Sequence, residues 1–208
     1  MYLLDSDAAK KVCQYQLLDE LSQALDSPLN EFAVLPQLKF QLRLNNDIKS
    51  LEKLGSPEAV RLANLLVEQA AEVEIVAETA NPILELNRPD IDSGEAILFA
   101  ALYGSDNDSM LSGDKRAFVA LSKINEIPKV EALWARVICL EEAIYLILKT
   151  ADFEKVSDKV RERPDVDISL SIAFGRSKVN TLHEVSEALL SNMKHLNAET
   201  SGKYILRA

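Results

Sequence analysis

Carboxylate side chains occur at three separate places in this chain, each beside a short apolar segment. Acids at the ends of strands and in the first turns of helices are typical ligands of a divalent metal ion. Hard oxygen donors without a nearby His or Cys favour Mg²⁺ or Mn²⁺ over zinc. The acids are Asp5 and Asp7 after residues 1–4, Asp92 and Glu95 before residues 96–103, and Asp114 after residues 110–113.

Short apolar strands alternate with amphipathic helices over residues 1–150, and this alternation predicts a parallel sheet covered by helices. The expected fold class is α/β, a three-layer α/β/α domain. Residues 72–78 fit a strand or a helix end equally well. Strands are expected at 2–4, 32–35, 109–112 and 132–139, and helices at 8–25, from Pro36 through Leu51, and at 56–71, 92–102, 114–122 and 140–149.

The last part of the chain departs from this rhythm. Residues 161–164 are typical of a linker, and 181–196 have the spacing of an amphipathic helix. We therefore expect a domain over 1–150 and a mainly helical C-terminal extension over 151–208. The apolar face of the last helix is expected to pack on the core or on a second subunit of a homo-oligomer. Its inward residues are predicted to be Leu182, Val185, Leu189 and Met193.

Composition and charge narrow the class of protein. No apolar run approaches the roughly 18 residues that a membrane helix needs, so a soluble cytoplasmic protein without membrane contact is expected. Cys13 and Cys139 lack CxxC spacing and are predicted to be buried free thiols, although a disulfide stays possible. The net charge is −10, and all of that excess lies in residues 1–149. A domain without a broad basic face fits a catalytic role better than a nucleic-acid-binding module.

The predicted topology brings the acids together. In an open parallel sheet the functional crevice lies at the carboxyl ends of the strands, where Asp5, Glu95 and Asp114 are all expected. Clustered carboxylates repel one another, and a bound Mg²⁺ or Mn²⁺ relieves that repulsion. Such an ion activates a water molecule and stabilises charge during displacement at phosphorus.

The three motifs together resemble the PIN domain family over about residues 1–150. The matching segments are Leu-Leu-Asp-Ser-Asp at 3–7, Asp-Ser-Gly-Glu-Ala at 92–96 and Leu-Ser-Gly-Asp-Lys-Arg at 111–116. The middle segment is similar to the branch of the family whose motif reads Asp-x-Gly-Glu-Ala. The strand and helix expected around 134–148 fit the last elements of that fold.

The resemblance implies a metal-dependent ribonuclease, often the toxin of a toxin–antitoxin pair. It implies that Asp5, Glu95 and Asp114 are the catalytic metal ligands and that RNA is the substrate, with an antitoxin or other protein as a possible partner. Asp7 stands where the family often has Asn, and Asp92 matches an outer carboxylate. Such domains usually carry another acid in the helix after the second strand, where this chain has Gln41.

Other readings stay open. Asp92 and Glu95 fit a capping box, and Asp114 fits a helix N-cap. The gap at Gln41 and the acidic surface favour a PIN-like protein-interaction module without nuclease activity. Asp5-x-Asp7 is also similar to the first motif of haloacid-dehalogenase phosphatases, but the residues after Asp7 and after Asp114 do not complete that pattern.

Basic residues beside the acids are candidates for contact with phosphate. Lys115 and Arg116 follow Asp114 directly, and Arg43 follows the second strand together with Lys39. A solvated helix face explains each of them as well. The segment His183 to Glu187 lacks the second histidine of a zinc motif and is expected on a surface helix.

Overall fold

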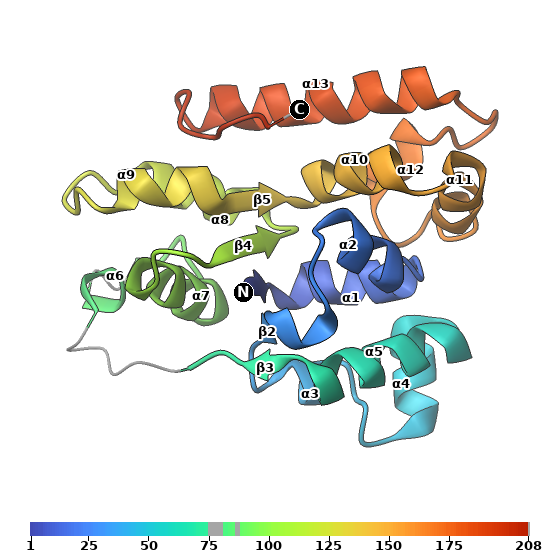
Figure 1. The fold of residues 1–208 in the computed structure, drawn as a ribbon, viewed down its shortest axis with the longest axis horizontal. Helices are drawn as coiled ribbons and strands as arrows, with labels where there is room; N and C mark the ends of the chain where they lie inside the picture. The colour runs from blue at the N-terminus through green and yellow to red at the C-terminus, as the bar shows by residue number, and fades with distance from the viewer. Residues whose placement is uncertain (75–80, 86–87, 208) are drawn as a thin grey trace.

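The computed structural model describes residues 1–74, 81–85 and 88–207. Five parallel strands form one sheet in the order β3-β2-β1-β4-β5 (Figure 1). The predicted parallel α/β class is therefore confirmed. The strands are β1 (Tyr2–Leu4), β2 (Phe32–Val34), β3 (Ala71–Glu72), β4 (Ser109–Ser112) and β5 (Val137–Cys139).

Helices cover both faces of this sheet, because neighbouring residues of a strand point to opposite sides. Leu4 belongs to one buried cluster and Leu3 to another. This arrangement is consistent with three layers. The first face is covered by α1 (Ser6–Gln14), α2 (Leu18–Ala24), α5 (Pro57–Gln69) and α10 (Leu140–Thr150), and the second by α7 (Ser93–Gly104), α8 (Lys115–Ser122) and α9 (Val130–Leu133).

The helix expected over 8–25 is in fact two helices. Gln16 adopts a left-handed backbone with φ 57°, a conformation that an α-helix does not contain. Its N–H donates to the carbonyl of Cys13 at 3.0 Å, which ends α1. The break turns the chain so that Leu17 and Leu18, which begin the next helix, are both fully buried.

The strand expected over 132–139 is shorter than predicted. Trp134 begins a 3-10 helix, η3 (Trp134–Arg136), and only Val137–Cys139 pair with β4. These three residues pair with Met110, Leu111 and Ser112. Residues 72–78, whose sequence fits a strand and a helix end equally well, begin at the end of β3. Residues 75–78 lie outside the described residues.

The helix predicted from Pro36 is also divided. It forms α3 (Leu38–Gln41) and α4 (Asp47–Leu54), with Arg43 between them at φ 60°. Ile48 and Leu51, whose spacing places them on one side of that helix with Leu38 and Leu42, do not share their burial, since their exposed fractions are 73% and 42%. The remaining short helices near the sheet are η1 (Leu29–Glu31) and α6 (Pro82–Glu85).

The segment after residue 150 packs against the sheet domain. It forms α11 (Phe153–Arg161), α12 (Ile168–Ala173) and α13 (Leu182–Glu199), and α13 lies along α10 in Figure 1. Val185 and Leu189 join one buried cluster, and Met193 joins the other. The prediction for Leu182 was wrong, because it lies in the first turn and is 43% exposed.

Two further expectations concern cysteines and membranes. Cys13 and Cys139 are buried free thiols, as predicted. Among the described residues no helix combines the length and apolarity needed to cross a bilayer.

Candidate functional site

The order of the strands reverses its direction between β1 and β4. From β1 the chain adds β2 and then β3 on one side, and it returns to place β4 and β5 on the other. Ligands of open parallel sheets bind outside the carboxyl ends of the strands at this kind of switch point. Asp5 directly follows β1, and Asp114 lies two residues beyond β4. The sheet therefore places two of the three candidate acids at this position.

Asp5 is the N-cap residue of α1, yet its carboxylate caps no backbone N–H. The side chain is buried, and its Oδ2 accepts a hydrogen bond from the Ser112 hydroxyl at 3.1 Å. The same hydroxyl oxygen accepts from the backbone N–H of Asp114 at 3.0 Å. Ser112 thus joins the two acids across β1 and β4. Helix capping does not explain the position of the Asp5 carboxylate.

Asp92 and Glu95 form the capping box that their spacing allows. Asp92 Oδ1 accepts from the Glu95 N–H at 2.8 Å, and Glu95 Oε2 accepts from the Asp92 N–H at 3.0 Å. This box begins α7. It occupies one oxygen of each side chain and leaves the others for a further ligand.

Asp114 caps α8 by accepting from the Arg116 N–H at 2.8 Å. The Arg116 guanidinium also donates to both oxygens of this carboxylate, from Nε to Oδ1 at 3.1 Å and from Nη2 to Oδ2 at 2.6 Å. These hydrogen bonds with Arg116 hold the pKa of Asp114 below its usual range. Because 90% of the Arg116 side chain is exposed, a competing ligand can displace it at little cost.

The acids influence one another electrostatically. Burial raises the pKa of Asp5, and the charges of Asp7 and Asp92 raise it further. Burial also raises the pKa of Glu95 to about 7, with added repulsion from Asp92, Asp114 and Asp5. These five carboxylates therefore lie close enough to repel one another, and a bound cation would relieve that repulsion.

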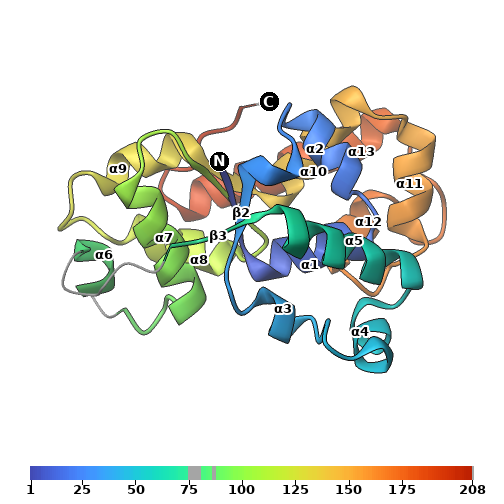
Figure 2. The same ribbon diagram turned by 60° about the horizontal axis from the view of Figure 1, so that its bottom comes forward.

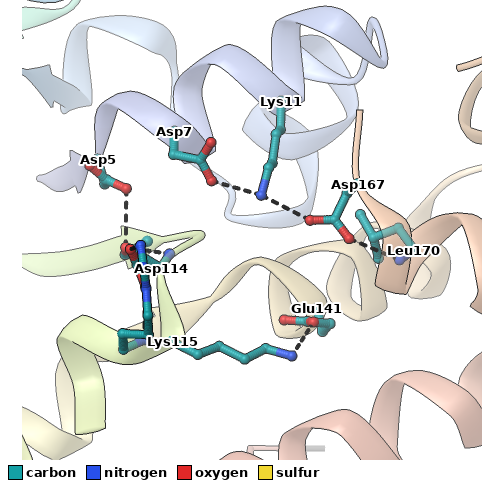
Figure 3. Close-up of polar contacts among 10 residues, drawn as sticks. Asp5, Asp7, Lys11, Asp114, Lys115, Glu141, Asp167 and Leu170 are labelled. Carbon is teal, nitrogen blue, oxygen red and sulfur yellow. Dashed lines mark hydrogen bonds and ion pairs between the residues drawn. The ribbon is translucent and has the colours of Figure 1, made fainter. Parts of the chain in front are cut away.

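Asp7 has a different environment. Its Oδ2 pairs with the Lys11 ammonium at 2.7 Å, and Lys11 also contacts Asp167 Oδ2 at 2.8 Å (Figure 3). A Cβ at Gly113 would lie 2.5 Å from Asp7 Oδ2, so this glycine makes room for the carboxylate beside the loop. The two ion pairs of Lys11 link the candidate site to α12, because Asp167 caps the first turn of that helix.

The four predicted basic residues have different positions, and Lys39 is exposed on α3. Lys115 pairs with the buried Glu141 at 2.5 Å, at the carboxyl end of β5 (Figure 3). Arg116 lies against Asp114. Arg43 is exposed in the turn between α3 and α4 and is not among the residues that line the pocket at the acids.

A pocket of about 600 Å³ opens at Asp92, Glu95 and Asp114, whereas Asp5 is not among the residues that line it. Its wall includes Glu199 at the end of α13, so the last helix contributes to the hollow. The predicted site residues that line this pocket are Asp92, Glu95, Asp114, Lys115 and Arg116.

The donor chemistry of these acids fits Mg²⁺ or Mn²⁺, since all the available atoms are carboxylate oxygens. Within residues 1–74, 81–85 and 88–207, however, no three such side chains converge closely enough to hold one ion. Asp114 is held by Arg116 and Asp7 by Lys11. Binding of an ion at Asp5, Glu95 and Asp114 therefore requires Arg116 to move aside.

Ser112 and Lys11 belong to the site although neither was predicted. Lys11 lies four residues after Asp7, and opposite charges at this spacing meet on a helix surface, so that pair was predictable. Ser112 has no comparable signal, because its role depends on the pairing of β1 with β4. The same holds for Glu141 and Asp167, which only the fold brings to the site.

Comparison with protein-family models, with curated proteins and with solved structures finds no match. The assignment of a function therefore depends on the geometry and chemistry of the site.

The raised pKa of Glu95 gives a prediction for the metal-free protein. Between pH 4.5 and about 7 the unfolded chain loses the Glu95 proton while the folded protein keeps it. The free energy of unfolding should therefore fall over this interval, by about 2 kcal/mol from this residue. Glu95→Gln removes the titration and keeps an oxygen for the capping box.

Urea denaturation in EDTA at several pH values measures this effect. The stability advantage of Glu95→Gln over the unmodified protein should grow from pH 4.5 to 7 and then level off. Glu68→Gln, at an exposed position of α5, is the matched control and should show no such growth. An advantage that is constant with pH would contradict the prediction.

Proposed function

We propose that this protein is a Mg²⁺- or Mn²⁺-dependent ribonuclease with a PIN-like domain. The observation that carries the proposal is the placement of Asp5 and Asp114 at the switch point of a parallel sheet, with Glu95 in the same electrostatic field. The resemblance of the three acidic motifs to the PIN family supports the same reading. An acidic crevice that binds a cation is suited to a phosphodiester substrate.

In this proposal Asp5, Glu95 and Asp114 hold the ion, and Asp92 orients Glu95 through the capping box. The bound ion supplies an activated water molecule and neutralises charge on the phosphate. Ser112 fixes the relative positions of Asp5 and Asp114. Lys115, anchored by Glu141, lies at the pocket wall where it can contact a substrate phosphate.

Titration with Mn²⁺ tests the cation site directly. A ligand that binds the folded state raises the melting temperature in proportion to the logarithm of its concentration. We expect such a rise for Mn²⁺, a smaller one after Asp114→Asn, and cleavage of a single-stranded RNA in the presence of the ion. A melting temperature that does not respond to millimolar Mn²⁺ would rule out the enzyme.

A protein-interaction module is the second candidate function. Arg116 on Asp114 and Lys11 on Asp7 favour it, because each internal cation neutralises a carboxylate without any metal. The position of Gln41 favours it too, since the carboxylate usual there in PIN domains is missing. Indifference to Mn²⁺ together with binding of a protein partner, such as an antitoxin or a second copy of the chain, would support this function.

A further inference from the structure

A second hollow, of about 310 Å³, lies beside the candidate site on the side of α1, α3 and α4. Asp7 lines it, and so does Gln41, the position at which an acid is missing. Two lysines complete the charged lining, Lys10 of α1 and Lys53 of α4. The hollow at the missing acid therefore holds two positive charges and the negative charge of Asp7.

A hydrogen bond between α1 and α4 fixes the helices that carry the two lysines against each other. Gln14 lies one turn after Lys10 in α1, and its side-chain amide donates to the Lys53 carbonyl at 3.2 Å. Gln14 is itself buried, so it fixes the end of α4 against α1. Figure 2 shows α3 and α4 on the same side of the molecule as α1. The hollow is thus formed by packed elements.

The two lysines of this hollow differ from its carboxylate, because Asp7 is already paired with Lys11. Lys11 is paired with Asp7 and Asp167, and Arg163 with Asp165. Within the described part of the chain, by contrast, neither Lys10 nor Lys53 forms an ion pair. Burial and the nearby Lys53 lower the pKa of Lys10, and the charge of Asp7 opposes this shift. Two ammonium groups that line one hollow and form no ion pair within the described residues are suited to bind an anion such as a phosphate.

We propose that the Lys10–Lys53 hollow binds a backbone phosphate of the RNA strand, one or more nucleotides away from the phosphate at the acids. The inference rests on the proposed function and adds a path for the substrate. The strand would cross from the pocket at Lys115, over the acids, to Lys10 and Lys53. The two basic ends position the strand by phosphate contacts, which carry no sequence information.

Binding of a labelled single-stranded RNA, measured by fluorescence anisotropy in Ca²⁺ at several salt concentrations, tests this proposal. Lys10→Gln/Lys53→Gln should weaken binding about 10-fold and make the slope of log K against log salt less steep by about 1.4, because each phosphate contact on a single strand contributes about 0.7. Lys155→Gln/Lys194→Gln, at exposed positions of α11 and α13, is the charge-matched control and should change neither quantity. Circular dichroism checks that the variants are folded.

The outcomes separate this inference from the proposed function. RNA binding that depends on Lys10 and Lys53, without cleavage in Mn²⁺, would support the hollow and reject the nuclease. Equal binding by the double variant and the unmodified protein would overturn the hollow as an RNA site. Absence of any RNA binding would also overturn it. A parallel titration with inorganic phosphate identifies a site for free phosphate, and stabilisation by phosphate without RNA binding would likewise reject the strand path.

Discussion

Replacing Asp5 by Asn is expected to abolish Mn²⁺-dependent cleavage of RNA while leaving the fold intact. Asp5 is the candidate ligand whose side chain has no capping role, and its loss removes a negative oxygen from the centre of the crevice. We expect cleavage to fall about 100-fold or more. The Asn carbonyl can still accept the Ser112 hydroxyl, so the contact between β1 and β4 is kept.

Stability separates this effect from simple unfolding. Burial raises the pKa of Asp5, which means that its charge is a cost in the metal-free protein. Asp5→Asn should therefore have an unfolding free energy in EDTA at pH 8 that is equal to that of the unmodified protein or higher. Asp19→Asn, in the first turn of α2, is the control for loss of a distant carboxylate. Full cleavage activity of the Asp5→Asn variant would show that Asp5 is not a ligand of the catalytic metal ion.

Replacing Tyr204 by Ala is expected to have the largest effect on stability. The ring is fully buried, at 6.0 Å from the Phe118 ring of α8. Its hydroxyl donates to the buried Glu142 and accepts from the Cys139 N–H at 3.0 Å. Truncation leaves a cavity and a buried carboxylate that loses its hydrogen bond from Tyr204 and keeps the ion pair with Arg207 at 3.3 Å. Together these should lower the free energy of unfolding by about 4 kcal/mol.

Tyr204→Phe distinguishes packing from hydrogen bonding. It keeps the ring and loses only the hydroxyl, so we expect a loss of about 1.5 kcal/mol. Chemical denaturation of the full chain measures both variants. If Ala costs no more than Phe, the ring does not pack as described. If Phe costs nothing, the bond to Glu142 has no role in stability.

The sheet and the positions of the acids were predictable because their causes are local. Buried parallel strands produce short apolar runs. Asp5 follows one of these runs directly, and Asp114 lies two residues beyond another. The capping box of Asp92 and Glu95 was equally visible, since its residues are three apart. Adjacent strands then had to bring Asp5 and Asp114 to one edge.

Other features were not predictable, because they depend on contacts between distant segments. The helix breaks at Gln16, and the turn there lets Leu17 and Leu18 reach the core. The sequence has no Gly or Pro at this turn that would have predicted it. The exposure of Ile48 and Leu51 arises because α4 packs on α1 and α5 through a different face. The basic hollow needs the contact of Gln14 with Lys53, across 39 positions of sequence.

The position of β1 in the middle of the sheet has a consequence for the rate of folding. β1 pairs with β2 early in the chain, but Tyr2 pairs with Ser109 on its other side. Contacts between residues so far apart in sequence slow folding, because a long loop must close first. Until β4 docks, β1 presents an unpaired edge, which is a site for association with other chains. We therefore expect refolding yield to fall at high protein concentration.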